Sequence, residues 1–269
     1  MLLERMYSTR DRLEKSAREL FYGSALFFPV RSAYQRVFNR KKWLFRGKMR
    51  DFYALFIRCG NLVFDVGANG GMYSEVFCEL GAKVVAVEPN PQFCQNLRRL
   101  ARVRPVYVEN CAAGDLPGKA TMHVCNYGGL SSLMNNWQEA IQQSPFPRDA
   151  KWIGTLEVEI ITLDQLAGRY GAPDFVKIDA EGYDDQVLRG MSFRPPALSF
   201  EFLRGIPSVA TRCFDVPALA SGGYEFNYVR GLDMQLACEC WVRADELRAR
   251  LDALAGDVEY GDVLARRIG

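Results

Sequence analysis

The sequence predicts an α/β fold built on a mostly parallel sheet, with a helical extension before it. Short apolar runs at Asn61–Val66 and Lys83–Val87 are typical of strands buried on both faces. Between them, apolar residues recur at helical spacing from Met72 to Leu80, and Gly81 follows where a helix would end. Strand, helix and strand in this order form the crossover unit that parallel strands need.

The extension covers residues 1–58 and differs from the rest of the chain in charge. It holds 14 Lys and Arg against 5 Asp and Glu, a balance of +9, which leaves −7 for residues 59–269. Residues 1–20 suit an amphipathic helix. Residues 31–50, rich in Arg, Lys and aromatics, can be a helical cap with a solvated basic face, a surface for an anionic substrate, a partner or self-association, or a contact with membrane surface or nucleic acid. No recognisable RNA-binding motif accompanies them, so we expect no nucleic-acid partner.

A glycine-rich turn joins the first strand to its helix and predicts a bound ligand. Gly67, Gly70 and Gly71 let backbone approach a ligand closely, and the helix beginning near Met72 directs its free N–H groups toward the turn. Glu88 lies 21 positions after Gly67, at the end of the second strand, where an acid can accept hydrogen bonds from both ribose hydroxyls. The turn therefore predicts a ligand that contains adenosine.

Two classes of adenosine ligand fit this turn. The dinucleotide fingerprint G-x-G-x-x-G would need glycine where this chain has Asn69 and Met72, which disfavours an NAD-dependent oxidoreductase. The string DVGANGGMYS, residues 65–74, is instead similar to the first motif of methyltransferases that use S-adenosylmethionine (AdoMet), whose ligand brings an amino-acid end where NAD brings a pyrophosphate. A non-catalytic module that retains the nucleotide turn is the remaining alternative.

A second stretch strengthens this resemblance. Residues 174–190 read DFVKIDAEGYDDQVLRG, and residues 87–91 and 162–164 read VEPNP and TLD. With the first motif, these segments resemble the FkbM family of methyltransferases over roughly residues 61–202. The resemblance implies the Rossmann-like class I methyltransferase fold, with a seven-stranded, mostly parallel sheet and an antiparallel hairpin. It also implies AdoMet-dependent O-methylation of hydroxyls on sugars and secondary metabolites, with S-adenosylhomocysteine as product.

The resemblance and the strand order together predict the cofactor-binding residues. Asp65 and the turn face the amino-acid end of AdoMet, and Glu88 with Pro89 faces the ribose. After a helix at Gln92–Val103 and a third strand at Pro105–Glu109, small residues let adenine lie against the backbone, although a simple turn would have the same composition. The full predicted set is Asp65, Gly67, Asn69, Gly71, Tyr73, Ser74, Glu88, Pro89, Asn110, Cys111, Ala112 and Asp179.

Residues 126–155 connect two further predicted strands, Lys119–Asn126 and Leu156–Leu163. A connection this long in a compact domain is often a functional lid, with a disordered surface insertion as the alternative. Trp137 and Trp152 within it can form apolar walls for an acceptor. His123, the only histidine, lies beside the connection and is a candidate base, although a lone strand histidine is more often structural.

The predicted catalytic groups follow the fourth and fifth strands, Phe175–Ile178 and Pro196–Leu203, because ligands of open α/β sheets bind beyond the carboxyl ends of the strands. Asp179 is the leading base or acceptor-orienting group. Lys177 lies on the same side of the strand and can hold Asp179 charged, or the two can form a structural salt bridge. Asp179 and Glu201 can instead share a magnesium ion, but no third ligand is evident, so no metal site is assigned.

The last predicted elements are a helix at Val209–Ala220, a hairpin of Tyr224–Arg230 with Met234–Trp241, and a helix at Arg243–Ala255, after which the tail adds little. Eight cysteines in a chain of this size, several on core elements, suggest buried thiols in the cytoplasm. With one histidine, no zinc ligand set assembles. No apolar run of 18 residues exists, so we expect no stable membrane insertion.

Overall fold

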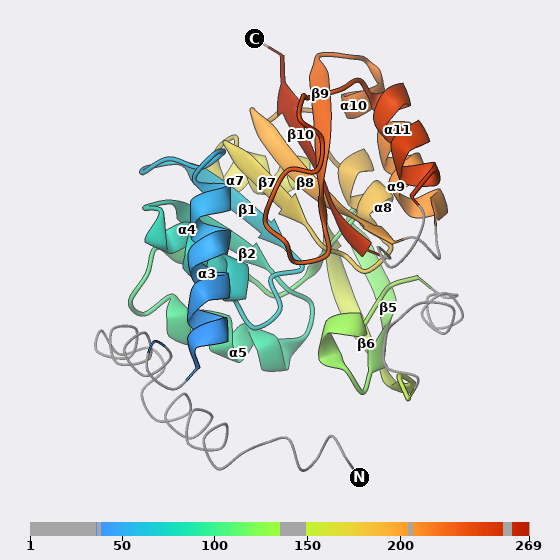
Figure 1. Cartoon of the computed structure of the whole chain (residues 1–269). Helices are drawn as coiled ribbons and strands as arrows, with labels where there is room; N and C mark the ends of the chain where they lie inside the picture. The colour runs from blue at the N-terminus through green and yellow to red at the C-terminus, as the bar shows by residue number, and fades with distance from the viewer. Residues whose placement is uncertain (1–35, 37–38, 135–148, 204–206, 255–259, 269) are drawn as a thin grey trace.

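A seven-stranded sheet forms the centre of the computed structural model, which describes residues 36, 39–134, 149–203, 207–254 and 260–268 (Figure 1). The strand order is β3-β2-β1-β7-β8-β10-β9. β3, β2, β1, β7 and β8 run parallel, and β10 pairs antiparallel with both β8 and β9. The strands are β1 (Leu62–Val66), β2 (Lys83–Val87), β3 (Val106–Glu109), β7 (Phe175–Ile178), β8 (Ala197–Leu203), β9 (Tyr224–Arg230) and β10 (Tyr260–Arg267).

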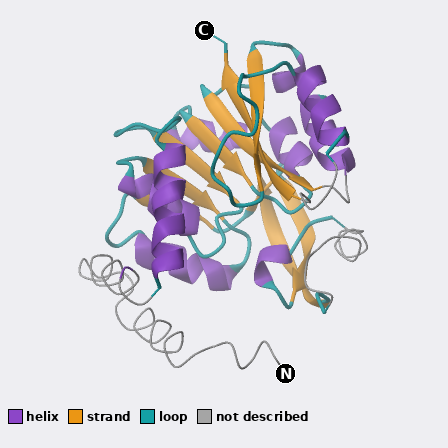
Figure 2. Ribbon diagram, in the orientation of Figure 1, coloured by secondary structure: helices purple, strands orange, loops and turns teal. Residues whose placement is uncertain are grey.

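Helices cover both faces of this sheet, as Figure 2 shows. The alternation of side chains along the strands produces the two faces: in β1, Val63 packs in the apolar cluster under α3, α4 and α5, and Phe64 packs in the cluster under α7 to α11. The helices are α3 (Arg40–Tyr53), α4 (Met72–Glu79), α5 (Pro91–Leu100), α7 (Leu163–Tyr170), α8 (Asp184–Arg189), α9 (Pro207–Phe214), α10 (Pro217–Ala220) and α11 (Ala244–Asp252). The seven-stranded, mostly parallel fold class predicted from the sequence is therefore confirmed.

The predicted partner of β9 was wrong. We expected Met234–Trp241 to pair with Tyr224–Arg230, but the antiparallel partner is β10, from the tail that was expected to add little. The segment at 234–241 forms turns beside β9, where Asn227 accepts a hydrogen bond from Cys238 N at 3.0 Å and donates to Cys238 O at 2.9 Å. Its alternating apolar residues pack on a strand without joining the ladder.

A second, smaller sheet stands beside the carboxyl ends of the central strands. It consists of β4 (Ala112–Ala113), β6 (Trp152–Ile161) and β5 (Gly118–Cys125), in that order. A short 3₁₀ helix, η2 (Gly128–Leu130), follows β5. Residues 135–148, with Trp137 and the middle of the predicted lid, lie outside the described residues, so the lid stays a prediction.

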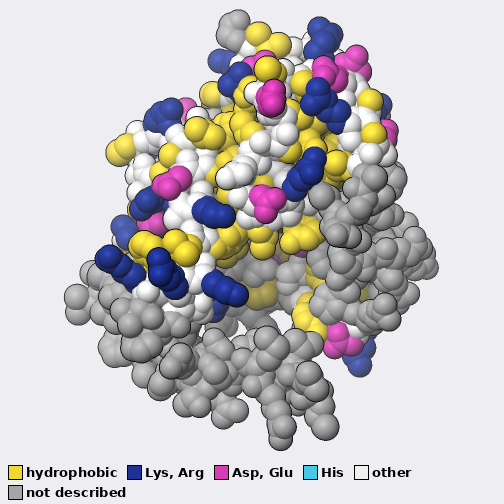
Figure 3. Space-filling model, viewed as in Figure 1, with side chains coloured by type: hydrophobic (Ala, Val, Ile, Leu, Met, Phe, Trp, Pro, Cys, Tyr) yellow, Lys and Arg dark blue, Asp and Glu magenta, His cyan; other side chains and the backbone are white. Residues whose placement is uncertain are grey.

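α3 is the described part of the basic extension, and its apolar face is part of the core. Tyr53 is 1% exposed and contacts the rings of Phe77 and Phe175 with centroids 5.0 Å and 5.8 Å apart. Arg46 reaches across to α4, with guanidinium nitrogens 2.8 Å from both Glu75 and Glu79. Lys and Arg side chains lie over α3 in Figure 3. Residues 1–35 lie outside the described residues, and the division at residue 58 stays a prediction.

In the part of the chain that the structure describes, no helix combines the length and the apolar character needed to cross a bilayer.

Candidate active site

The turn after β1 is shaped by close contact with the end of β7. Gly67 has φ +76°, and a Cβ at this position would collide with the carbonyl oxygen of Asp179. Asp179 N in turn donates to Val66 O at 3.0 Å. Gly71, with φ +86°, precedes α4 in a left-handed conformation that glycine adopts without strain. The first strand's turn and the fourth predicted strand's end therefore form one wall.

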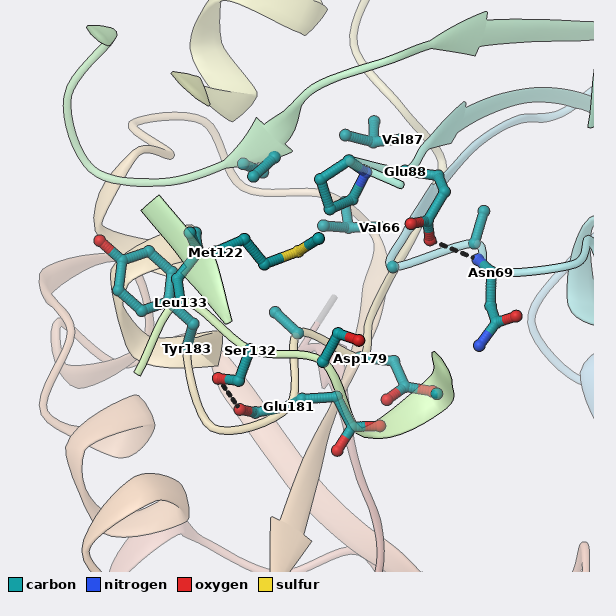
Figure 4. Close-up of a pocket in the computed structure, with 18 of the residues that line it drawn as sticks. Val66, Asn69, Val87, Glu88, Met122, Ser132, Leu133, Asp179, Glu181 and Tyr183 are labelled. Atoms are coloured by element: carbon teal, nitrogen blue, oxygen red, sulfur yellow. Dashed lines mark hydrogen bonds between the residues drawn. The ribbon is translucent and has the colours of Figure 1, made fainter. Parts of the chain in front are cut away.

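A cavity of about 420 Å³ lies over this wall, within the range of small-molecule sites. Four segments contribute to it: the turn after β1, the end of β2, the small sheet with the loop after η2, and the loop after β7 (Figure 4). Of the predicted site residues, the cavity is lined by Gly67, Asn69, Tyr73, Glu88, Pro89, Ala112 and Asp179. Those that do not line it are Asp65, Gly71, Ser74, Asn110, Cys111, His123, Lys177 and Glu201.

Glu88 lies at the end of β2 with its carboxylate tied to the turn after β1. Its Oε2 accepts from Asn69 N at 2.8 Å and its Oε1 from Asn90 N at 2.7 Å. Only 6% of Glu88 is exposed, and burial raises the pKa of its carboxyl to about 7, although the two backbone N–H groups oppose the shift. Each carboxylate oxygen has a second lone pair, so Glu88 can still accept hydrogen bonds from a ligand.

Asp65 and Ser74 lie behind the cavity wall. Ser74 Oγ donates to Asp65 Oδ2 at 2.6 Å, and both side chains are at most 1% exposed. Burial raises the pKa of Asp65, while the charge of Lys177 opposes the shift. The pair fixes α4 on β1, where it can act on a ligand only through the turn that it supports.

Asn110 and Cys111 also lie behind the residues that line the cavity. The Asn110 side chain donates to Glu88 O at 3.1 Å and to Pro89 O at 3.0 Å, so it holds the end of β2 in place. Cys111 is 7% exposed and belongs to the core cluster under α7 and α8. Of Cys111 and Ala112, the two residues that we expected beside adenine, only Ala112 lines the cavity.

Lys177 and Asp179 form an ion pair at the edge of the cavity. Lys177 Nζ is 2.8 Å from Asp179 Oδ2 and 4.2 Å from the centre of the Tyr73 ring. Lys177 is 1% exposed, while the Asp179 side chain is 31% exposed. Burial would lower the pKa of Lys177, but the charge of Asp179 raises it well above its ordinary value. A buried, charged lysine thus holds a carboxylate that faces the cavity.

Two more acids meet Asp179 at this end. Glu181 and Glu201 each have a carboxylate oxygen within 4.8 Å of one from Asp179 and from each other. Burial, followed by repulsion from neighbouring carboxylates, raises the pKa of both Glu181 and Glu201 well above the ordinary range. Three carboxyl groups of the site therefore gather here, and Asp179 and Glu181 lie at the opposite side of the cavity from Glu88 (Figure 4).

His123 lies on β5 and stacks on the Trp152 ring, with centroids 5.5 Å apart and planes at 26°. Its backbone pairs with Ser132. The neighbouring residue, Met122, is 3% exposed and lines the cavity instead. Because successive strand residues face opposite sides, Met122 and not His123 points into the site.

Comparison with known proteins identifies the family. The family model described as the methyltransferase FkbM domain matches residues 65–202, which is half of the chain and includes the turn, Glu88 and the loop after β7. The chain belongs to the FkbM methyltransferase family. Membership confirms the resemblance stated from the motifs and favours AdoMet over the NAD alternative as the ligand of the turn.

Two curated proteins are similar to this FkbM methyltransferase over part of their length. A hexuronic acid methyltransferase, AglP, from Haloferax volcanii is 30% identical over 148 residues, which are 52% of this chain and 54% of that protein. A ubiquinone biosynthesis O-methyltransferase from Methylocella silvestris is 36% identical over 73 residues, 27% of this chain and 28% of its own. The chain thus spans about half of the first and about a quarter of the second.

Solved structures with a similar chain path include two methyltransferase-related proteins. A precorrin-6y C5,15-methyltransferase from Geobacter metallireducens has a TM-score of 0.42 at 11% identity and covers 83% of this chain and 87% of its own. Fibrillarin from Aeropyrum pernix, in complex with AdoMet, has a TM-score of 0.39 at 11% identity, with 78% and 68% covered.

Several cavity residues of this FkbM methyltransferase were not predicted as site residues, and four of them bear on the site's chemistry. Glu181 stands in the string KIDAEG of residues 177–182 but was not among the predicted residues. Ser132 lies in the predicted lid, and its Oγ donates to Glu181 O at 2.7 Å. Met122 lines the cavity without any motif around it, and Tyr183 lines it directly after the string KIDAEG. Met122 reaches the cavity through the register of its strand and Tyr183 through the path of its loop, and neither property can be read from the sequence alone.

Proposed function

We propose that this FkbM methyltransferase transfers the methyl group of AdoMet to a hydroxyl of a saccharide or of a glycosylated or secondary metabolite. The observation that carries the proposal is that Glu88 and Asp179, from the ends of β2 and β7, line one cavity. A ribose-binding acid and a candidate base are thereby separated by the space that a nucleoside sulfonium would fill. The similarity to a protein named a hexuronic acid methyltransferase supports a saccharide acceptor.

AdoMet would lie along the cavity with its ribose on Glu88. Ala112, Met122 and Leu133 would form the apolar walls for adenine, since all three line the cavity on the side of the small sheet. The amino-acid end would face the backbone of the turn after Gly67, near the beginning of α4, where free N–H groups favour a carboxylate. Asp65, Ser74, Asn110, Cys111 and Lys177 would be positioning residues, because they support the lining from behind.

The reaction is an in-line displacement. The acceptor oxygen attacks the methyl carbon, the carbon–sulfur bond breaks, and its electron pair returns to sulfur, which yields S-adenosylhomocysteine. The hydroxyl proton passes to Asp179, whose carboxylate Lys177 holds in place through a contact of 2.8 Å. Holding oxygen, carbon and sulfur in line supplies most of the acceleration, and a positioned base adds about 10²- to 10⁴-fold.

The test replaces Asp179 by Asn. We expect Asp179→Asn to reduce kcat for methyl transfer from labelled AdoMet to a sugar hydroxyl by about 10²- to 10⁴-fold, while S-adenosylhomocysteine binds as in the wild type by calorimetry. Asp233→Asn, at an exposed loop position, is the matched control. His123→Gln tests the other candidate base and should change kcat by less than about threefold, because His123 does not line the cavity.

Undiminished turnover in Asp179→Asn would remove Asp179 as the base. Methylation of amines but of no hydroxyl, across a panel of sugars and glycosides, would overturn the proposed reaction.

Two further proposals concern the setting. All eight cysteines are unpaired in the structure, which supports work in a reducing compartment such as the cytoplasm. The acids at the far end of the cavity would repel a phosphate backbone, which supports a small-molecule or glycan acceptor rather than a nucleic acid.

A further inference from the structure

The acidic end of the cavity holds more carboxyl groups than its neighbours can pair with. Asp179, Glu181 and Glu201 bring three carboxylate oxygens within 4.8 Å of one another. Lys177 compensates one of them, through its contact of 2.8 Å with Asp179 Oδ2. Asp179 and Glu181 line the cavity and lie side by side in Figure 4, so small solutes reach them from the cofactor side.

A second observation concerns buried oxygens without partners. Among the described residues, Glu181 Oε2 and Asp184 Oδ2 are shielded from solvent and receive no hydrogen bond. Asp184 is 0% exposed, and its other carboxylate oxygen accepts from Glu201 N at 3.1 Å, which places it against the same cluster. A buried carboxylate oxygen that nothing contacts is costly, so such atoms leave room for a partner that the protein does not supply, such as a bound ion.

The backbone also holds Glu181 in an unusual conformation. Its φ is +50°, in the left-handed region that residues with a side chain rarely adopt. Ser132 Oγ donates to the Glu181 carbonyl oxygen at 2.7 Å and fixes the peptide in place. The loop after η2 therefore orients Glu181 through its backbone and leaves its carboxylate directed at Asp179 and Glu201. Strain of this kind concentrates at functional sites.

We propose that Asp179, Glu181 and Glu201 bind one divalent cation of the Mg²⁺ or Mn²⁺ class. Carboxylate oxygens are the ligands that these hard cations prefer, and water or substrate oxygens complete the shell. The three carboxylate oxygens lie within 4.8 Å of one another, so small movements of the side chains would bring all three into contact with one ion. Asp179 has two carboxylate oxygens, so it can keep Lys177 on one and use the other for the cation.

Glu181 is the third ligand that the sequence did not reveal. Asp179 and Glu201 follow neighbouring strands, so their proximity could be predicted, but Glu181 reaches them only through its left-handed backbone. If the proposed methyl transfer holds, the cation lies next to the acceptor and lowers the pKa of a hydroxyl bound to it. Asp184 then stabilises the site as one more negative charge behind the three ligands.

The experiment measures Mn²⁺ binding by electron paramagnetic resonance and Mg²⁺ binding by calorimetry, on the full chain with S-adenosylhomocysteine present. We expect saturable binding of one ion per chain with Kd below about 1 mM at pH 8. Glu181→Gln and Glu201→Gln should each weaken it at least about tenfold. Glu239→Gln, the same change at an exposed loop position, should leave it unchanged. Affinity should fall from pH 8 to pH 6 as protons compete with the cation.

Two results would overturn the cation site. One is that neither ion shows saturable binding up to 10 mM, and the other is that the wild type, Glu181→Gln and Glu201→Gln bind equally. Circular dichroism of each variant controls for folding. The proposed function fails in a different way. If S-adenosylhomocysteine binds and methyl transfer proceeds while neither ion shows saturable binding, the cation site falls and the methyltransferase proposal stands. If S-adenosylhomocysteine does not bind, the proposed function falls, and cation binding by the apoprotein is then measured separately.

Discussion

Glu88 must satisfy two opposing demands. Its position at the end of β2 removes its carboxylate from water, which raises the pKa to about 7, whereas accepting hydrogen bonds from ribose hydroxyls requires the ionised form. Asn69 N and Asn90 N keep the carboxylate oriented in either form. Ligand binding should therefore be coupled to loss of one proton from Glu88.

The prediction for Glu88 is a pH-dependent affinity. Because the ligand selects the carboxylate, S-adenosylhomocysteine should bind more tightly as pH rises from 6 to 8. At pH values below the pKa of Glu88, the affinity should rise by up to about tenfold for each pH unit. Glu88→Gln should weaken binding at pH 8 by at least about tenfold and flatten this dependence. Calorimetry at pH 6, 7 and 8 measures both, and an unchanged slope in the variant would show that another group titrates.

Among single residues, those that belong to a sequence motif were the ones that the sequence placed at the cavity. Gly67, Glu88 and Asp179 follow strand ends that the apolar runs define, and all three line the cavity. His123 and Met122 show the limit. Both lie on the predicted strand, and only the register of β5 against β6 decides which of them faces the ligand.

The element that most directly joins fold to site is the β1 turn. β1 pairs with both β2 and β7, so its turn contacts Glu88 on one side and Asp179 on the other. Gly67 allows the close contact with Asp179 because it lacks a Cβ. The glycine-rich turn is therefore a requirement of sheet packing as well as of ligand approach.

Gly67→Ala tests this requirement. The new Cβ would meet the Asp179 carbonyl in a left-handed conformation, so we expect the free energy of unfolding to fall by more than about 2 kcal/mol. Gly154→Ala is the matched control, because its Cβ would meet no atom within 4 Å and its φ is not positive, and it should change stability by less than about 0.5 kcal/mol. Urea unfolding of both variants measures the difference. Equal stability of the two would mean that β7 can move away from the turn.

The antiparallel edge shows what the sequence could not predict at the element scale. Tyr224–Arg230 and Met234–Trp241 both have strand-like composition and flank a short turn, which favours a hairpin. β10 occupies the place between β8 and β9 instead, with seven residue pairs on each side. The local sequence pattern cannot decide between the nearby segment 234–241 and the distant strand β10 as the partner of β9. β10 forms hydrogen-bonded ladders with both β8 and β9, whereas the nearby segment would form one ladder, with β9 alone.

For the whole molecule, buried carboxylates should control stability as a function of pH. Burial raises the pKa values of both Glu88 and Asp184 to about 7, above about 4 in an unfolded chain. Between pH 4 and 7 the native state therefore binds more protons, and its stability falls as pH rises.

We expect the ligand-free chain to unfold more easily at pH 8 than at pH 5.5, by on the order of 2 kcal/mol for each of the two groups. Asp184→Asn should reduce this difference, since it removes one titrating group. Urea unfolding in chelator at the two pH values is the measurement. A chain that is more stable at pH 8, or a variant with the full difference, would contradict the prediction.

The insertion of β10 between β8 and β9 has a consequence for biosynthesis. While the ribosome is still adding residues 231–259, β8 has an open edge and β9 has no neighbour to join, so neither can complete its ladder. Such unsatisfied edges invite pairing with other nascent chains. Folding of this half of the domain should therefore wait until β10 has been synthesised, and a chaperone that shields strand edges before then would increase the yield of native protein.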